Sequence, residues 1–402
     1  MSRHIVISAD GHAFGPGNGS LDTEHLEMLD EYFEPQFRED YLGYRQSFET
    51  SARPMIARLF DDNATSAFAE LEGVNRSTGL FNSQQRLKDL EADGIVAEVL
   101  FPNRVPFSRD FKDAYPQELR EAGARAYNRW LADFCSEAPG RRAGMAVISL
   151  YDIGRAVTEV QSAKENGLSG VVLPNYWRTE GIPPYLDPCY ELFWAACADM
   201  QLPVNVHGGA SMGDVDMTRY GVSAMLTYAT EATFLSTRPF TLMLWGGVFE
   251  RHPTLTFVIT ESRADWIPSR LAFLDAVYED QLFAHVKETV KHRPSEYWKR
   301  QCYVVASFMS RDEALMRHSI GLDTVMWGAD YPHYEGTWPH TNKWLKETFG
   351  GLPTPDVKAI LSENPARVFG FDLAELSTHA ETIGPPIDDL ETYEPKGKFW
   401  RW

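Results

Sequence analysis

The chain has 402 residues, of which 44% are hydrophobic and 24% charged, as in an ordinary globular protein with a large buried core. Acidic residues outnumber basic ones by 57 to 38, and the net charge of -19 argues against nucleic acid or an anionic membrane as partner. No apolar run approaches the roughly 18 residues that a membrane span needs.

Short runs rich in Val and Ile predict strands that are buried on both faces. In chain order, the predicted strands are Ile5–Ala9, Ala97–Phe101, Gly144–Ile148, Gly170–Leu173, Pro203–His207, Thr256–Thr260, Tyr303–Ala306 and Thr324–Gly328.

Amphipathic stretches between these runs predict helices, among them Gln84–Ala92, Asp152–Asn166, Leu192–Met200 and Trp266–Tyr278. Alternating strands and helices favour a parallel sheet, and eight strands favour a closed (β/α)8 TIM barrel of the α/β class. An open nucleotide-binding sheet is the weaker interpretation, because neither GxGxxG nor a Walker pattern is present. We expect one barrel domain over residues 1–371.

Three segments exceed normal loop lengths. Residues 13–83 and 208–235 follow the first and fifth predicted strands, so we expect them to form lids or substrate walls at the barrel mouth. Residues 372–402 form an acidic C-terminal tail that ends in Phe399-Trp400-Arg401-Trp402. We expect these aromatic residues to dock on the barrel itself or on a partner subunit.

The four cysteines have no CxxC spacing, and the chain starts directly with a strand-like run rather than a signal peptide. These features predict reduced cysteines and a cytoplasmic protein.

Carboxylates and imidazoles recur at the ends of three predicted strands. Asp10 and His12 follow the first, His207 ends the fifth, and Asp330 follows the eighth. Strand ends of a barrel meet at one mouth, and residues i and i+2 of a strand face the same side, so these four side chains can share one ion. Mixed imidazole and carboxylate ligands predict one divalent metal, with Zn²⁺ as first choice and Mn²⁺ or Fe²⁺ as alternatives.

Several segments together resemble the amidohydrolase-related barrels grouped with aminocarboxymuconate-semialdehyde decarboxylase. The resemblance covers nearly the whole chain and rests on ISADGH, LKDLEADGIVAEVLFPN, YNRWLADFCSEAPGR, GLSGVVLPN, PVNVHGG, ESRADWIPSRLAFLD, MWGADYPHYEGTWP and ILSENPARVFGF. It implies a metal-dependent barrel enzyme that catalyses hydrolysis or decarboxylation without an organic cofactor. Carried over by position, the metal ligands are again Asp10, His12, His207 and Asp330, and a homodimer or larger homo-oligomer is implied.

The chain departs from the pattern of this family at two places. Many members have a histidine where Asp10 stands, so we expect a changed metal preference. The decarboxylases of the family have a catalytic histidine after the sixth strand, whereas this chain has Thr260-Glu261-Ser262-Arg263.

Three residues are predicted to be catalytic. Asp330 can accept the proton of a metal-bound water, and His333 can donate a proton to a leaving group. Glu261 can orient His207 or act directly as an acid or base. Side chains after strand ends are predicted to bind substrate, namely Asn103, Arg104, Asn175, Tyr176, Trp177, Arg263 and Trp338. They suggest a cyclic or aromatic substrate, and an arginine would favour a carboxylate on it.

The sequence therefore predicts a metal-dependent hydrolase that acts on an amide, lactone or carbon–carbon bond of a small cyclic or aromatic molecule. The alternative is a non-oxidative decarboxylase of an aromatic or unsaturated acid, and a hydratase is a third reading. A metal-stabilised binding protein is the non-enzymatic alternative, suggested by the altered turn at Glu261.

Overall fold

The computed structural model describes residues 2–14, 24–48, 50, 78–107, 115–174, 181–208, 217–220, 222–333 and 335–397. Its strands form one parallel sheet in the order β1-β3-β4-β5-β6-β7-β8-β9, with β2 paired to β3. The strands are β1 Ile7–Ser8, β2 His12–Ala13, β3 Ala97–Pro102, β4 Arg142–Val147, β5 Gly170–Leu173, β6 Val204–His207, β7 Phe257–Thr260, β8 Cys302–Ser307 and β9 Val325–Gly328.

Backbone hydrogen bonds join the first and last strand segments. The Ala9 amide donates to the Trp327 carbonyl oxygen at 2.9 Å, and the Asp330 amide donates to the Asp10 carbonyl oxygen at 2.9 Å. This seam between β1 and β9 closes the sheet, which confirms the predicted TIM barrel and its eight strand positions.

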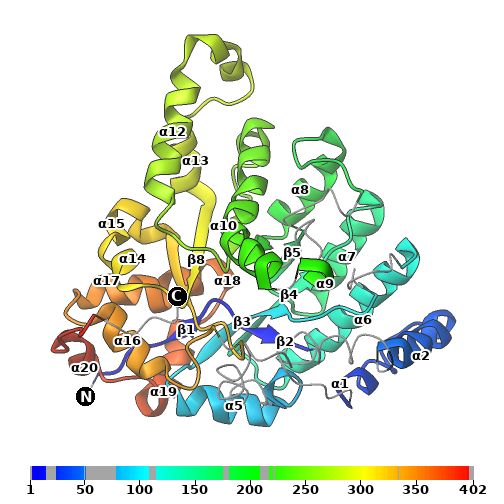
Figure 1. Cartoon of the computed structure of the whole chain (residues 1–402), viewed down its shortest axis with the longest axis horizontal. Coiled ribbons are helices and arrows are strands. Elements are labelled where there is room, and N and C mark those ends of the chain that lie inside the picture. Colours follow the sequence, from blue (N-terminus) through cyan, green and yellow to red (C-terminus); the bar gives the residue numbers. More distant parts are fainter. Residues whose placement is uncertain are drawn as a thin grey trace.

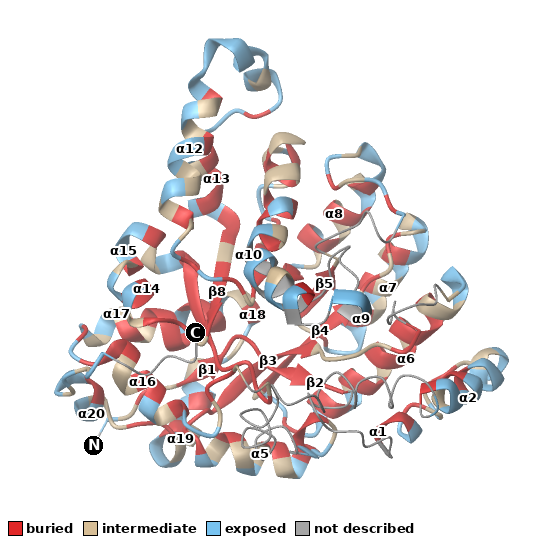
Figure 2. Ribbon diagram, viewed as in Figure 1, coloured by how far each residue is buried: buried red, intermediate tan, exposed pale blue. Residues whose placement is uncertain are grey.

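Helices surround the sheet, with their buried faces turned toward the strands (Figures 1 and 2). The longer helices are α2 Arg38–Ser47, α5 Ser83–Ala92, α6 Gln117–Ser136, α7 Ile153–Glu165, α8 Glu191–Asp199, α10 Val222–Trp245, α12 Ile267–Glu279, α13 Pro294–Gln301, α16 Thr341–Phe349 and α19 Leu373–Ile383. The shorter ones are α1 Glu24–Glu27, α9 Met217–Tyr220, α11 Val248–Arg251, α14 Arg311–Leu315, α15 Arg317–Ile320, α17 Thr354–Lys358, α18 Asn364–Phe369 and α20 Ile387–Glu391. The four predicted helices match α5, α7, α8 and α12 to within a few residues.

Local signals explain where helices begin and end. The Asp152 side chain caps α7 by accepting a hydrogen bond from the Arg155 amide, and Gly167 follows this helix with φ 79°. Alternate residues of each strand point into the barrel, among them Val99 and Phe101 of β3, where they form a separate apolar core.

The long segments differ from the expectation of extended loops. Residues 208–235 are not a loop throughout, because α10 begins at Val222 and runs to Trp245. Pro239 lies inside this helix, a position that usually predicts a helix end. Within 13–83, the described part contains α1 and α2.

The described part of residues 372–402 contains α19 and α20, which pack on the first residues of the chain. The His4 amide donates to the Pro385 carbonyl oxygen, and the Ile387 amide donates to the Ser2 carbonyl oxygen. The four aromatic-rich terminal residues lie outside the described part of the chain. Within the described residues, no helix combines the length and apolar character that crossing a bilayer requires.

Candidate metal centre

Asp10 and His12 lie where the first strand is irregular. Ser8 pairs with Glu98 and His12 pairs with Phe101, so four residue steps on this strand oppose three on β3. This is a bulge, a feature that often re-aims side chains beside active sites. The simple alternation assumed from the sequence does not hold here, yet both side chains are buried and His12 Nε2 lies 3.8 Å from Asp10 Oδ1.

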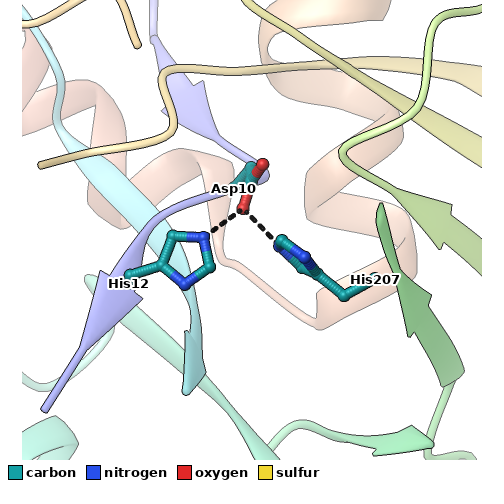
Figure 3. Close-up of side chains that lie close together, drawn as sticks. All are labelled: Asp10, His12 and His207. Atoms are coloured by element: carbon teal, nitrogen blue, oxygen red, sulfur yellow. Dashed lines mark hydrogen bonds and ion pairs between the residues drawn. The ribbon is translucent and has the colours of Figure 1, made fainter. Parts of the chain in front are cut away.

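Asp10 contacts His207, which ends β6. His207 Nε2 lies 3.1 Å from Asp10 Oδ1, and Figure 3 shows Asp10 between the two imidazoles. The Ser307 hydroxyl of β8 donates to the other carboxylate oxygen, Oδ2. Gly328 makes room for this arrangement, because a Cβ there would lie 2.5 Å from Asp10 Cβ.

One ring nitrogen of His12 has a lone pair that could bind a metal. Its Nδ1 donates a hydrogen bond to the Pro102 carbonyl oxygen at 3.2 Å, which leaves Nε2 as the nitrogen with the lone pair. Burial, together with His333 and His207, holds the pKa of His12 well below its ordinary value. The ring is therefore neutral, and Nε2 is buried without a hydrogen-bond partner.

His207 is held on both sides by carboxylates. Its Nδ1 lies 3.2 Å from Glu261 Oε2, which is the orienting contact that the sequence suggested for Glu261. Burial lowers the pKa of His207, but Asp10 and Glu261 raise it further, to about 10. Glu261 has φ 51°, and a Cβ at Gly208 would lie 2.2 Å from its carbonyl oxygen, so only glycine permits this close approach.

Asp330 lies beyond β9, in a turn with φ 56° that aims its side chain into the mouth. The residue is fully buried, and neither carboxylate oxygen has a hydrogen-bond partner. Oδ1 lies 3.2 Å from His12 Nε2 and 3.0 Å from His333 Nδ1.

His333 stacks on His12 with ring centroids 4.1 Å apart. Its Nε2 lies 3.0 Å from Asn103 Oδ1, so both ring nitrogens face acceptor oxygens. Burial lowers the pKa of His333, but Asp330 and more distant carboxylates raise it to about 10. Asn103, one of the predicted substrate residues, is thus in direct contact with this imidazole.

Glu335 was not predicted from the sequence. It belongs to a group of four side chains that each offer one ligand atom, and these four atoms lie within 4.8 Å of one another. The group consists of Glu261, Asp330, His333 and Glu335. Burial raises the pKa of Glu335 to about 8 against the opposing effect of His333, with Asp330 and Glu261 adding to the rise. The sequence feature that could have identified Glu335 is its position two residues after His333.

The other predicted substrate residues lie in varied surroundings. The Arg104 guanidinium lies over the Phe48 ring at 4.7 Å, and Trp338 packs edge-on against Tyr331 at 5.2 Å. Arg263 is half exposed and pairs with Asp265 at 3.0 Å. Asn175, Tyr176 and Trp177 fall outside the described residues.

The residues present fit a divalent metal. Asp10, His12 and His207 offer ligand atoms within 4.8 Å of one another, and so do His12, Asp330 and His333. His12 Nε2 and both Asp330 oxygens carry lone pairs, are buried and accept no hydrogen bond. Such atoms are costly to bury unless a cation or a proton binds them.

The family model for amidohydrolases matches residues 83–371, most of the chain. This chain belongs to the amidohydrolase family. The predictions of an enzyme of this family and of its barrel are thereby confirmed. Comparison of this amidohydrolase with curated protein sequences finds no match.

Solved structures share the fold of this amidohydrolase at low sequence identity. The 5-carboxyvanillate decarboxylase of Sphingomonas paucimobilis is 20% identical, with a TM-score of 0.64, over 92% of this chain and 99% of the other. That of Novosphingobium aromaticivorans, with bound manganese, is 17% identical with a TM-score of 0.63, over 91% and 97%. The 2,6-dihydroxybenzoate decarboxylase from Rhizobium is 18% identical with a TM-score of 0.61, over 92% and 99%.

Proposed function

We propose that this amidohydrolase is a metal-dependent decarboxylase of a small aromatic or unsaturated carboxylic acid. The sequence favoured hydrolysis and kept decarboxylation as the alternative, but the names of the similar structures support the alternative better. The observation that carries the proposal is the placement of His333, a proton donor held against the candidate metal ligands.

Asp10, His12, His207 and Asp330 would hold the divalent ion. When bound, the ion supplies a positive charge that fixes an anionic oxygen of the substrate and draws electron density from it. The manganese in the Novosphingobium structure supports Mn²⁺ ahead of the Zn²⁺ that the sequence favoured.

The groups around the two ring nitrogens of His333 indicate its protonation state. Asn103 Oδ1 lies 3.0 Å from Nε2 as a hydrogen-bond acceptor, and Nδ1 forms an ion pair with Asp330 Oδ1 at 3.0 Å, so the surroundings of the ring favour the imidazolium form. In decarboxylation the bond between the carboxylate and the ring carbon breaks and CO2 leaves. The electron pair stays on that carbon, and the His333 imidazolium donates the proton that replaces the carboxylate.

The histidine that related decarboxylases have after the sixth barrel strand is replaced here by Glu261. Its Oε2 lies against His207 Nδ1, so Glu261 fixes the orientation of that ring. His333 offers an imidazole at the same mouth from the turn after the last strand. A different turn can thus supply the acid that the strand-six turn lacks.

Hydrolysis remains a second candidate because of Asp330. A fully buried carboxylate whose oxygens accept no hydrogen bond can take the proton of an attacking water. In that mechanism Asp330 is the base, and His333 protonates the leaving group.

Isotopes distinguish the two candidates. The manganese-loaded protein is incubated with a panel of hydroxybenzoates, and with aromatic amides and lactones, in D2O and separately in H2(18)O. Decarboxylation releases CO2 and leaves one deuterium on the ring carbon, with no 18O in the ring product. Incorporation of 18O into a cleaved amide or lactone, without CO2 release from any acid, would contradict the proposed function.

A further inference from the structure

The two oxygens of the Asp10 carboxylate have different surroundings. Oδ1 faces the candidate metal centre, with His207 Nε2 at 3.1 Å and His12 Nε2 at 3.8 Å. Oδ2 points away from both imidazoles (Figure 3) and accepts a hydrogen bond from the Ser307 hydroxyl. Because Asp10 is fully buried, water does not compete with Ser307 for this oxygen.

The contact between Asp10 and Ser307 spans an intervening strand. Asp10 follows β1 and Ser307 ends β8, and β9 lies between these two strands in the closed barrel. Tyr303 and Val305 of β8 belong to the inner core, so the alternation along the strand points Ser307 inward as well. Ser307 pairs in register with Gly328 of β9, where a Cβ would lie 2.5 Å from Asp10 Cβ. Glycine at this position therefore lets the carboxylate pass over β9 and reach the hydroxyl on β8.

The backbone of Asp10 is held by contacts that do not involve its carboxylate. Its carbonyl oxygen accepts hydrogen bonds from the Ser8 hydroxyl at 2.6 Å and from the Asp330 amide at 2.9 Å. The Ser8 hydroxyl also accepts a hydrogen bond from the Ala329 amide, which joins the two strand ends. With the main chain fixed in this way, the hydrogen bond from Ser307 acts on the rotation of the carboxylate itself.

We propose that Ser307 is a positioning residue that makes Asp10 a one-oxygen metal ligand and so sets which ions the centre selects. The proposal rests on the metal-dependent function proposed above. A carboxylate that chelates an ion must turn both oxygens toward it, and the hydrogen bond from Ser307 holds Oδ2 away. Coordination through one oxygen suits ions with few ligands, such as Zn²⁺, whereas Ca²⁺ takes about 6–8 oxygen ligands and accepts chelating carboxylates.

The test compares the wild type with Ser307→Ala, Ser307→Thr and Thr260→Val. Ser307→Ala removes the hydroxyl, and Ser307→Thr keeps it. Thr260→Val is the matched control, because Thr260 ends the neighbouring strand β7 and its buried hydroxyl has no hydrogen-bond partner. Each protein is stripped with chelator, and competition with a fluorescent chelator gives its Kd for Zn²⁺ and for Ca²⁺. Circular dichroism verifies that each variant is folded.

We expect Ser307→Ala to bind Zn²⁺ about 10–100-fold more weakly, the usual effect of removing a group that orients a metal ligand. Its affinity for Ca²⁺ should fall less or increase, because the freed Oδ2 can take part in chelation. The ratio of Zn²⁺ to Ca²⁺ affinity should therefore fall in Ser307→Ala and stay at the wild-type value in Ser307→Thr and Thr260→Val. A merely structural defect would weaken the binding of both ions by the same factor.

A crystal structure of the manganese-loaded wild type provides a measurement that does not depend on the variants. We expect Asp10 Oδ2 to remain on the Ser307 hydroxyl. An unchanged ratio in folded Ser307→Ala, or chelation through both Asp10 oxygens in the wild type, would overturn the role of Ser307 and leave the metal-dependent function standing. Failure of the wild type to bind any of the three ions would overturn both.

Discussion

Arg86 Nη1 donates a hydrogen bond of 2.6 Å to the backbone carbonyl oxygen of His12, so a fully buried guanidinium holds the strand end that carries a candidate metal ligand. Its Nε and Nη2 form a two-point ion pair with Glu98, at 2.7 Å each. The guanidinium also lies 4.6 Å from the centre of the Tyr331 ring, next to Asp330. Arg86 thus contacts the strand ends that carry two of the predicted ligands.

Arg86→Met should lower the free energy of unfolding by about 3–5 kcal/mol, because it leaves the Glu98 carboxylate buried without its main partner. Urea unfolding measures the change. Arg293→Met is the control, since Arg293 and its partner Glu279 are both exposed and the loss of such a surface pair should change the free energy of unfolding little. A double variant, Arg86→Met with Glu98→Met, should recover part of the loss. If Arg86→Met were as stable as the wild type, the pair would not be important for folding.

Asp330→Asn should abolish turnover while the barrel still folds. The amide keeps the shape of the side chain but removes the charge that pairs with His333 and that the proposed metal site requires. Steady-state kinetics and circular dichroism, measured on the same preparation, test both parts. Full activity in the variant would remove Asp330 from the mechanism.

Metal-free protein should lose stability as the pH rises from 7 to 9. His207 and His333 have folded-state pKa values of about 10, raised above the unfolded value of 6.5. Between these values the folded state binds more protons than the unfolded state, so the free energy of unfolding falls as pH rises. Each such proton contributes a slope of about 1.4 kcal/mol per pH unit.

Urea unfolding of chelator-treated protein at pH 7, 8 and 9 measures this slope. Glu261→Gln should reduce it, since the variant removes a carboxylate that raises the pKa of His207. A stability that stays level or increases over this range would show that these imidazoles are neutral in the folded metal-free protein.

Gly328→Ala should destabilise the protein by about 1–3 kcal/mol and weaken metal binding, because the added methyl group would lie 2.5 Å from Asp10 Cβ. Gly43→Ala is the matched control. Gly43 lies within α2 and its Cβ would meet nothing within 4 Å, so this change should stabilise by about 0.4–1 kcal/mol. Thermal and urea unfolding compare the two. Equal changes in the free energy of unfolding would mean that the strands can move apart at Asp10 without loss of stability.

Much of the fold could be predicted from the sequence because each strand is a short Val- and Ile-rich run that ends in polar residues. The start of α10 was missed, since its sequence was assigned to a long loop and Pro239 interrupts the helical pattern. The recurrence of Asp and His at strand ends predicted which side chains meet at the mouth.

Glu335 and Arg86 were missed for a different reason. Glu335 reaches the mouth only because the chain turns at Asp330, a non-glycine residue with φ 56°, and residue spacing does not predict such a turn. Arg86 lies on an apparently amphipathic helix, where an arginine is normally assigned to the solvent side. Its burial depends on Glu98, which stands within a strand otherwise made of apolar residues.

The seam that closes the barrel also has a consequence for how the protein is made. Asp10 and Asp330 meet across the junction of the first and last strands, where the Asp330 amide donates to the Asp10 carbonyl oxygen. During synthesis from the N-terminus, the ribosome must therefore deliver about four-fifths of the chain before the two carboxylates can come together. With the proposed ligands, metal loading would be a late event in the folding of the barrel, and a chain truncated before Asp330 would leave the ribosome unable to complete the centre.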